Sequence, residues 1–479
     1  MGFDEQPCET LRHDAACPVY AHPACWEGLP SKKFPLHGTP AAVAAELIKD
    51  ELSLDCNPKM NLASFVTTYM EPEVEALILD GMHKNYIDLD QYPQTADLHN
   101  RCVALLGDLF HCPAKPIGTS CVGSSEAIML AGLAMKRKWK LRREAQGLPA
   151  DKPNIVMGAN VQVCWHKMCR YFEIECREAD VTPDALVLTA ATAKPLIDEH
   201  TIGVCAVLGS TFNGEFEDVK AIHDMVEDVN AEHGWNVVIH VDAASGGFIA
   251  PFLTPELLWD FRLPLVKSIN ASGHKFGLVY AGIGWAMWRE ESDLPDDLVF
   301  HVNYLGGDQA SFTLNFSKGA GNVIAQYYNF MRLGREGYRN LMQCGMHTAE
   351  YLRQRLRDTG LFDIVDKAHM PLVAFSLKNT DKFTCFDIQD KVRSRGWILP
   401  AYTCPKGAEK LVIMRVVVKQ NFSQPMADML VEDILRATAA LETHAAALEG
   451  SKSASKAVHH AIGHSIHHRK LGHRTRGVC

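Results

Sequence analysis

The sequence predicts an α/β fold, with a large domain built on a mainly parallel sheet and a smaller C-terminal α+β domain. Three observations lead to this class. Between about residues 60 and 345, short apolar segments typical of buried strands alternate with helical stretches. Beyond residue 345 the order changes to helix, strand, strand and helix. The 479 residues also exceed the length that one core usually holds together, so more than one domain is expected.

The individual elements follow from the residues in chain order. A first helix is expected to have Thr39 as its N-cap and Pro40 as its first residue, a position where proline is well tolerated. Apolar runs predict strands of the large domain at 154–157, 202–208, 237–241 and 281–288. The small domain is expected to contain strands at 372–377 and 411–418 and a closing helix through Leu430, Ile434 and Leu441.

These elements divide the chain into five expected segments. They are an extension without periodicity (1–30), a helical segment (31–59), the large domain (60–345), the small domain (346–450) and a tail (451–479). The tail holds six Lys or Arg, six His and no acidic residue. Since the whole chain carries a net charge of −9, the first 450 residues carry −9 − 6 = −15. A basic tail on an acidic body is expected to dock on that body or on an acidic partner.

The composition excludes several classes of protein. Hydrophobic content of 47% and charged content of 22% are ordinary for a globular protein, and the acidic balance favours no nucleic-acid partner. No apolar run reaches membrane-spanning length, and the first residues lack a secretory pattern, so we expect a cytoplasmic protein without a membrane span. The 15 cysteines follow no framework spacing, which favours reduced thiols. Without a Cys-x-x-Cys pair near Cys17 and Cys25, no metal site is expected.

The strongest chemical signal is Ser272-x-His274-Lys275 together with Asp242, which ends the apolar run at 237–241. A pyridoxal-phosphate enzyme needs a lysine that forms a Schiff base with the cofactor. It also needs an acid that keeps the pyridinium nitrogen protonated, so that the ring acts as an electron sink. Each element alone is weak, but together they predict pyridoxal 5'-phosphate as the cofactor.

A glycine–serine turn at 118–127 leads into a long helical stretch. Such a turn offers backbone N–H groups, hydroxyls and the positive end of the helix dipole to an anion. The alternative is that Ser124 only caps the helix. A dinucleotide site would need G-x-G-x-x-G after a strand, and that pattern is absent here. With Asp242 and Lys275 downstream, a phosphate site is the better interpretation.

At this point the chain resembles the glutamate decarboxylases of the plant and bacterial type, which are fold-type-I pyridoxal-phosphate enzymes. The motifs are NLASF (61–65), GSSEA (123–127), NVQVCW (160–165), HVDAASGGF (240–248), SGHKFG (272–277) and NFSKG (315–319). The similarity covers about residues 31–445 and is closest to the plant branch. Such a collinear set is far more specific than one lysine motif.

The resemblance implies roles around the cofactor. Lys275 would be the Schiff-base lysine and Asp242 the partner of the pyridinium nitrogen. The other residues that would contact the cofactor are Ser124, Ser125 and His274 at the phosphate, Ser317 of a neighbouring subunit also at the phosphate, Gln162 and Ala244 on the two ring faces, and Thr211 at the polar edge. Because sites of this kind draw on two subunits, the resemblance also implies a homo-oligomer, either a dimer or a hexamer of dimers.

The resemblance further implies a substrate site. Ser64 and Phe65 match positions that hold the distal carboxylate, aided by Asn85 and Asp88 across a dimer interface. Arg415 matches an arginine near the substrate. Tyr304, in a loop at 303–307, is a candidate proton donor, although it could equally serve only to pack at the interface.

The implied reaction is the decarboxylation of L-glutamate at its α-carboxylate to 4-aminobutanoate and CO2. The protonated ring would take up the electron pair left by CO2, and holding the far end of the substrate would set the scissile bond perpendicular to that ring. Two alternatives stay open: a decarboxylase of aspartate or cysteine sulfinate, and a catalytically weak protein that binds partners.

The tail suggests regulation. Plant members of the family often end in a basic segment that binds calmodulin, and Val458, Ile462 and Ile466 are spaced as on one helix face. The tryptophan expected in such a segment is missing, because none lies beyond Trp397. The six histidines are also suited to sensing pH, since they charge near pH 6.5. A solvated tail without a regulatory role is the third alternative.

Overall fold

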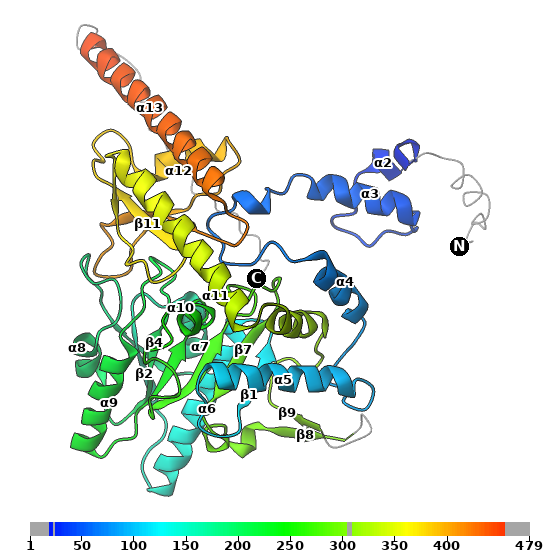
Figure 1. Ribbon diagram of the computed structural model, residues 1–479, viewed down its shortest axis with the longest axis vertical. Coiled ribbons are helices and arrows are strands. Elements are labelled where there is room, and N and C mark those ends of the chain that lie inside the picture. The colour runs from blue at the N-terminus through cyan, green and yellow to red at the C-terminus, as the bar shows by residue number, and fades with distance from the viewer. Residues whose placement is uncertain (1–18, 23, 304–308, 456–479) are drawn as a thin grey trace, which may run out of the picture. The chain divides into compact units, whose positions relative to one another are not determined.

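The computed structural model describes residues 19–22, 24–303 and 309–455 (Figure 1). The chain forms two compact units, Met1–Asn61 and Leu62–Cys479. The described elements of the first unit are η1 (Val19–Ala21), α2 (Ala24–Glu27), α3 (Ala41–Leu52) and η2 (Pro58–Met60). The prediction that Thr39 caps α3 is wrong by one residue. Pro40 is the N-cap, because its ψ of 139° keeps it extended and outside the helix.

The second unit is organised around a seven-stranded sheet in the order β1-β7-β6-β5-β4-β2-β3. Its strands are β1 (Ile117–Cys121), β2 (Asn154–Gly158), β3 (Glu175–Ala179), β4 (Thr201–Val207), β5 (Val238–Asp242), β6 (Val266–Ala271) and β7 (Gly284–Trp288). All neighbours are parallel except β7, which is antiparallel to both β1 and β6. The predicted α/β class and the strands at β2, β4 and β5 are confirmed. The run predicted at 281–288 begins as a strand only at Gly284.

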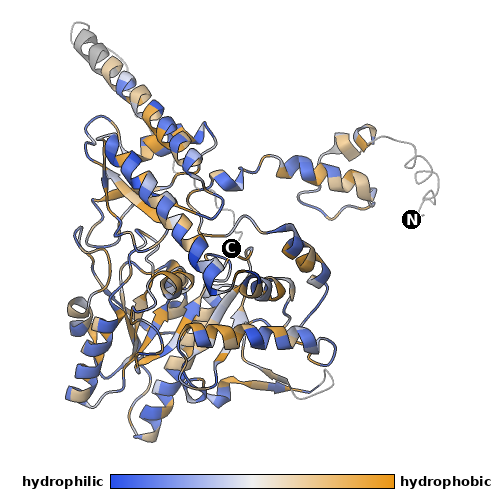
Figure 2. Cartoon of the chain, viewed as in Figure 1, coloured by the Kyte–Doolittle hydropathy of each residue, from blue (hydrophilic) through white to orange (hydrophobic). Residues whose placement is uncertain are grey.

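Helices cover both faces of this sheet (Figure 1). The helices of this part of the chain are α4 (Pro72–Gly81), α5 (Pro93–Leu109), α6 (Ser124–Ala145), α7 (Val163–Tyr171), α8 (Ala190–Ala193), α9 (Val219–His233) and α10 (Ala250–Leu253), of which α4 lies beside the sheet rather than on it. Short 3₁₀ turns are η3 (Lys194–Leu196), η4 (Gly246–Phe248), η5 (Glu291–Asp293) and η6 (Asp296–Leu298). Figure 2 shows that these helices carry both hydrophilic and hydrophobic residues, as expected for helices with one buried face.

The alternation of side chains along the strands separates two layers of core. Ile155 and Met157 of β2 pack with residues of α6 and α7, whereas Val156 between them joins the core that includes α9. Because successive side chains of a strand point to opposite faces, one strand contributes to both layers. This double burial explains why β2, β4 and β5 could be recognised as continuous apolar runs.

A smaller antiparallel sheet follows, in the order β10-β11-β13-β12. Its strands are β10 (Phe362–Ile364), β11 (Leu372–Leu377), β12 (Ala401–Thr403) and β13 (Val412–Val417), and its helices are α12 (Cys385–Arg393) and α13 (Gln424–Ser455). The strands predicted at 372–377 and 411–418 are confirmed. A separate hairpin pairs β8 (Phe300–Val302) with β9 (Gln309–Ser311).

The two sheets are joined by α11 (Gly321–Asp358), which bends at Gly334, where φ is 57° and ψ is −170°. A positive φ of this kind is readily adopted only by glycine, so Gly334 provides the bend. The boundary expected at residue 345 falls within this helix, and the division into a large and a small domain stays a prediction. Among the described helices, none combines the length and the apolar character needed to cross a bilayer.

A buried carboxylate lies behind the end of β4. Glu217 is 3% exposed, and one of its oxygens accepts a hydrogen bond from the Val207 amide at 2.6 Å. The other accepts from the Asn160 side chain at 2.8 Å and from the Leu188 amide at 3.1 Å. Burial raises the pKa of Glu217 from 4.5 to about 7, although the three N–H donors act in the opposite direction.

We expect Glu217 to make stability depend on pH. Its pKa is higher in the native than in the unfolded state, so its contribution is present below pH 4.5 and is lost as the pH rises to about 7. Gln at this position does not titrate. The difference in unfolding free energy between wild type and Glu217→Gln should therefore fall by about 3 kcal/mol between pH 4.5 and 7.5. Urea denaturation at both pH values measures it, with the exposed Glu227→Gln as control. A pH-independent difference would contradict the assignment.

Candidate active site

A cavity of about 480 Å³ lies where β4, β5 and β6 end and where the turn after β1 begins α6. Since β1 is parallel to these strands, all four carboxyl ends meet at the same edge of the sheet, where α/β folds usually bind ligands. The predicted site residues that line this cavity are Phe65, Ser124, Ser125, Gln162, Thr211, Asp242, Ala244, His274, Lys275 and Arg415. Segments more than 300 residues apart in sequence thus converge on one site.

Lys275 follows β6 and extends its amine into the cavity. Nζ donates a hydrogen bond to the Ser245 hydroxyl at 3.2 Å and lies 5.1 Å from the centre of the Phe65 ring. Burial lowers the pKa of Lys275; the Arg415 charge acts in the same direction, and Asp242 opposes both. At a given pH, a larger fraction of this amine is therefore in the neutral, nucleophilic form than for an exposed lysine.

Asp242, the last residue of β5, is held by three donors. Its Oδ2 accepts from the Trp165 indole N–H at 2.8 Å. Its Oδ1 accepts from the Asn270 side chain at 2.9 Å and from the Ala244 amide at 3.1 Å. The three donors fix the orientation of this carboxyl group at the wall of the cavity.

The contacts continue behind Asp242. Asn270 donates through its Nδ2 to Asp242, so its Oδ1 faces Nε2 of His240 at 2.7 Å, and that nitrogen must carry a proton. The other ring nitrogen of His240 lies 2.7 Å from the Ser268 hydroxyl, which then donates to it. Burial lowers the pKa of His240, consistent with a neutral ring. Asn270 therefore connects the carboxylate to a fully buried histidine.

We expect Asn270→Ala to weaken this network on both sides. Asp242 would lose one donor, and the buried Nε2–H of His240 would lose its acceptor, which typically costs about 1–3 kcal/mol for an unsatisfied buried group. Thermal denaturation should show a lower midpoint, and kcat should fall because the Asp242 carboxylate is less well oriented. The exposed Asn379→Ala is the control. An unchanged kcat in a destabilised variant would mean that Asn270 has only a structural role.

The turn before α6 has the features of an anion site. Gly123 is the N-cap and Ser124 the first helical residue, without a side-chain capping bond, so the interpretation of Ser124 as a simple cap is wrong. Its hydroxyl instead pairs with that of Ser272 at 2.7 Å. Nδ1 of His274 is buried without a hydrogen-bond partner among the described residues. Burial, aided by the Lys275 charge, lowers the pKa of His274 to about 4.

Two glycines leave room at this turn. A Cβ at Gly123 would lie 3.1 Å from Cε1 of His274. A Cβ at Gly284, the first residue of β7, would come within 2.5 Å of the Gly123 backbone. The absence of a side chain at Gly284 thus lets β7 approach the turn closely.

Arg415, on β13 of the smaller sheet, is the second cation of the cavity. It is 6% exposed, and its Nη atoms donate to the backbone carbonyls of Thr211 and, at 2.5 Å, of Ala63. Its guanidinium lies 4.7 Å from the centre of the Phe65 ring. Nε has no partner among the described residues. A buried N–H donor of this kind is suited to a carboxylate ligand.

Some predicted residues lie elsewhere. Ser64 lies between two residues that line the cavity, Ala63 and Phe65, but its hydroxyl oxygen accepts a hydrogen bond from the Val66 amide at 3.1 Å. Asn85 contacts Ser317, with 3.4 Å between Nδ2 and Oγ, and Asp88 accepts from the Gln91 amide. None of these four predicted residues (Ser64, Asn85, Asp88 and Ser317) lines the cavity; Ser317 lines a separate one of about 200 Å³. Tyr304 and the residues of the tail beyond 455 lie outside the described residues.

Several residues with a part in the site were not predicted. Ser245 and Ser272, the partners of Lys275 and Ser124, both fall inside the sequence motifs, and Ser272 begins the lysine motif, but neither was assigned a role of its own. Trp165 also lies within a motif, but its bond to Asp242 spans 77 residues. Asn270 carries no local signal, since it is an ordinary residue of β6.

Comparison with known proteins agrees with this geometry. Residues 35–378 match the family model described as the pyridoxal-dependent decarboxylase conserved domain. The chain is 57% identical to glutamate decarboxylase 5 of Arabidopsis thaliana over 86% of this chain and 85% of that protein. It is 53% identical to a glutamate decarboxylase of Petunia hybrida, over 92% and 89%. A solved glutamate decarboxylase of Lactobacillus brevis superimposes with a TM-score of 0.86 at 42% identity, covering 88% of this chain and 98% of that one.

Proposed function

Because the chain belongs to the pyridoxal-dependent decarboxylase family, we propose that it decarboxylates L-glutamate with bound pyridoxal 5'-phosphate. The products are 4-aminobutanoate and CO2. The observation that carries this proposal is the convergence of Lys275, Asp242 and Arg415 on one cavity. Similarity to glutamate decarboxylases over most of the chain supports the choice of substrate.

The residues present fit this cofactor. The N-terminus of α6, with the hydroxyls of Ser124 and Ser125, suits a phosphate group, and the unpartnered Nδ1 of His274 offers one more contact. Asp242 would face the ring nitrogen, and Gln162 and Ala244 would bound the ring. Lys275 would hold the cofactor covalently through Nζ. When bound, the cofactor supplies an electron sink for the pair of electrons left at Cα as CO2 departs.

The protein's own residues would direct the reaction as follows. Asp242, held in place by its three donors, would keep a proton on the ring nitrogen. Arg415 would pair with a substrate carboxylate through Nε, while Ser64 and Phe65 would position the distal carboxylate. Fixing both ends of the substrate is what aligns the scissile bond. Tyr304 would return a proton to Cα.

The chain is proposed to act as a cytoplasmic homo-oligomer, as a dimer or a hexamer of dimers. Ser317, Asn85 and Asp88 lie outside the cavity of their own chain, which fits the expectation that they serve a neighbouring subunit. Residues 451–479 are proposed to bind calmodulin or to respond to pH. Truncation after Gly450 with no change in either the calcium response or the pH profile would rule out both.

The decisive experiment is CO2 release from L-glutamate, run beside L-aspartate and L-cysteine sulfinate, with and without added pyridoxal phosphate. We expect cofactor-dependent release from glutamate. Release from aspartate or cysteine sulfinate alone would keep the chemistry and overturn the substrate. An inactive protein that still binds the cofactor would favour the partner-binding alternative.

A further inference from the structure

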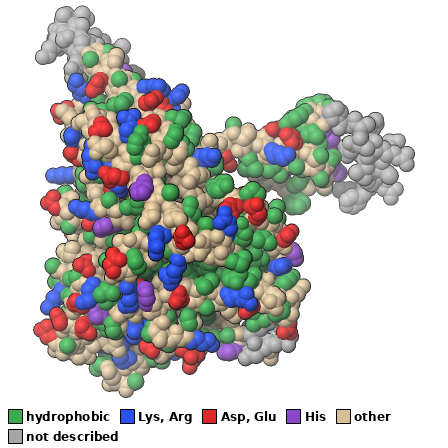
Figure 3. Space-filling model, in the orientation of Figure 1, with side chains coloured by type: hydrophobic (Ala, Val, Ile, Leu, Met, Phe, Trp, Pro, Cys, Tyr) green, Lys and Arg blue, Asp and Glu red, His purple; other side chains and the backbone are tan. Residues whose placement is uncertain are grey.

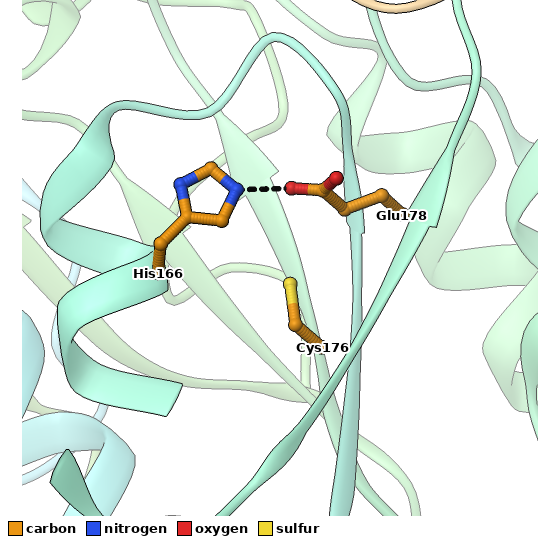
Figure 4. Close-up of side chains that lie close together, drawn as sticks. All are labelled: His166, Cys176 and Glu178. Carbon is orange, nitrogen blue, oxygen red and sulfur yellow. Dashed lines mark hydrogen bonds and ion pairs between the residues drawn. The ribbon is translucent and has the colours of Figure 1, made fainter. Parts of the chain in front are cut away.

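Three side chains with different metal-binding atoms meet between α7 and β3 (Figure 4). His166 lies on α7, and Cys176 and Glu178 lie on β3. The two strand residues are separated by one position, so their side chains point to the same face of the strand, toward the helix. One imidazole nitrogen, the thiol sulfur and one carboxylate oxygen all lie within 4.8 Å of one another.

The surroundings permit an ion to enter. β3 is an edge strand of the seven-stranded sheet, and the side chains of His166 and Glu178 are 46% and 27% exposed. Arg177, between Cys176 and Glu178, points to the opposite face, where it pairs with Asp198 at 2.6 Å. This cation therefore does not compete for the Glu178 carboxylate. Solvent can reach the cluster, so water can complete the coordination of an ion.

The inner side of the cluster is rich in sulfur. Sγ of Cys176 lies 3.5 Å from Sδ of Met157 on β2. A contact with buried Cys169, and then burial, raises the pKa of Cys176, so the free thiol holds its proton. A metal ion that binds a cysteine displaces such a proton. His166 and Glu178 are hydrogen bonded to each other, and both would turn from this contact toward the ion.

We propose that His166, Cys176 and Glu178 bind a zinc ion. Imidazole, thiolate and carboxylate are the ligands that Zn²⁺ accepts in four-coordinate sites, and a water molecule would be the fourth ligand. A thiolate disfavours Mg²⁺ and Ca²⁺, which prefer oxygen. The charges balance as well, since one thiolate, one carboxylate and a neutral imidazole offset the two charges of the ion. The site is independent of the proposed decarboxylase activity.

A zinc ion bound by His166, Cys176 and Glu178 would crosslink α7 and β3. The N-cap of α7 is Gln162, which lines the active-site cavity, and Trp165, next to His166, donates to Asp242. Bound zinc should therefore raise the thermal midpoint of the protein, a readout that does not depend on activity.

Cobalt(II) is the probe for the ligand set, because it accepts the same tetrahedral sites and its bond to a thiolate absorbs in the near ultraviolet. The full-length holoenzyme is titrated with cobalt(II) alone, and the spectrum without metal is subtracted, since the cofactor also absorbs. We expect a thiolate-to-cobalt band in wild type and in Cys344→Ser, a control that removes an exposed cysteine of α11. The band should be lost in Cys176→Ser.

Zinc binding, measured by equilibrium dialysis, separates this site from the histidines of the tail. Cys176→Ser and His166→Ala should each bind one zinc equivalent fewer than wild type. Affinity at this site should fall by more than about 100-fold, because loss of even an outer partner costs 10–100-fold. Circular dichroism verifies that the variants fold. An unchanged cobalt band and an unchanged zinc stoichiometry in folded Cys176→Ser would overturn the proposal.

Discussion

Replacing Lys275 by alanine should abolish the decarboxylation of glutamate, with a loss of at least about 10⁴-fold in kcat, as is typical when a covalent catalytic group is removed. The described structure offers no nearby replacement, because Lys275 is the one lysine that lines the cavity. The variant should still fold, since the amine makes a single described hydrogen bond, to Ser245 at 3.2 Å, and its charge is disfavoured by burial.

The same variant has a second readout. Borohydride reduction should fix the cofactor on the wild-type chain and increase its mass, whereas the mass of Lys275→Ala should stay unchanged. Lys267→Ala, on the same strand β6 but paired with Glu290 at the surface, is the matched control and should behave as wild type. Normal turnover by Lys275→Ala would contradict the proposed function.

Replacing Arg415 by lysine should lower kcat/KM for glutamate by about 100-fold or more. Loss of one partner from a buried charge pair typically costs about 2–5 kcal/mol, and a lysine amine cannot reach two backbone carbonyls and a substrate carboxylate together. A rise in KM with little change in kcat would indicate a binding role. A fall in kcat would indicate that Arg415 also orients the scissile bond.

Arg355→Lys, on α11 and paired with Asp428 at 2.7 Å, is the control for the change from arginine to lysine. Cofactor absorbance and the thermal midpoint show whether the Arg415→Lys site is intact. A well-folded variant with wild-type kcat/KM would remove Arg415 from the substrate site.

The distribution of charged side chains on the surface does not point to a particular partner. On the face that Figure 3 shows, acidic and basic side chains are interspersed rather than gathered into one patch of a single sign. The net charge of −9 is therefore not concentrated on that face in a way that identifies a partner.

The zinc proposal revises one expectation from the sequence. The sequence predicts no metal site, because it contains no Cys-x-x-Cys pair near Cys17 and Cys25. His166 and Cys176 are ten residues apart and are brought together only when α7 packs on the edge of the sheet. When the ligands come from two separate elements, the sequence contains no short motif by which the site could be recognised.

The sequence by itself determined the fold class, the three strands β2, β4 and β5, and the pair Lys275 and Asp242. The strands were recognisable because burial on both faces demands continuous apolar runs. The pair was recognisable because each residue lies in a contiguous motif at the end of a strand. β1, with Gly and Ser, and β3, a partly exposed edge strand, have no such run and were missed.

Only the tertiary structure decided which distant groups meet. It placed the antiparallel β7 between β1 and β6, joined Asn270 to Asp242, and brought Arg415 from the smaller sheet to the loop at Thr211. Local sequence patterns indicate which side chains are buried and where turns occur, because these properties depend on the residues of one segment. Strand order and side-chain convergence depend on how separate segments pair and pack, and this pairing is decided by the free energy of the whole fold.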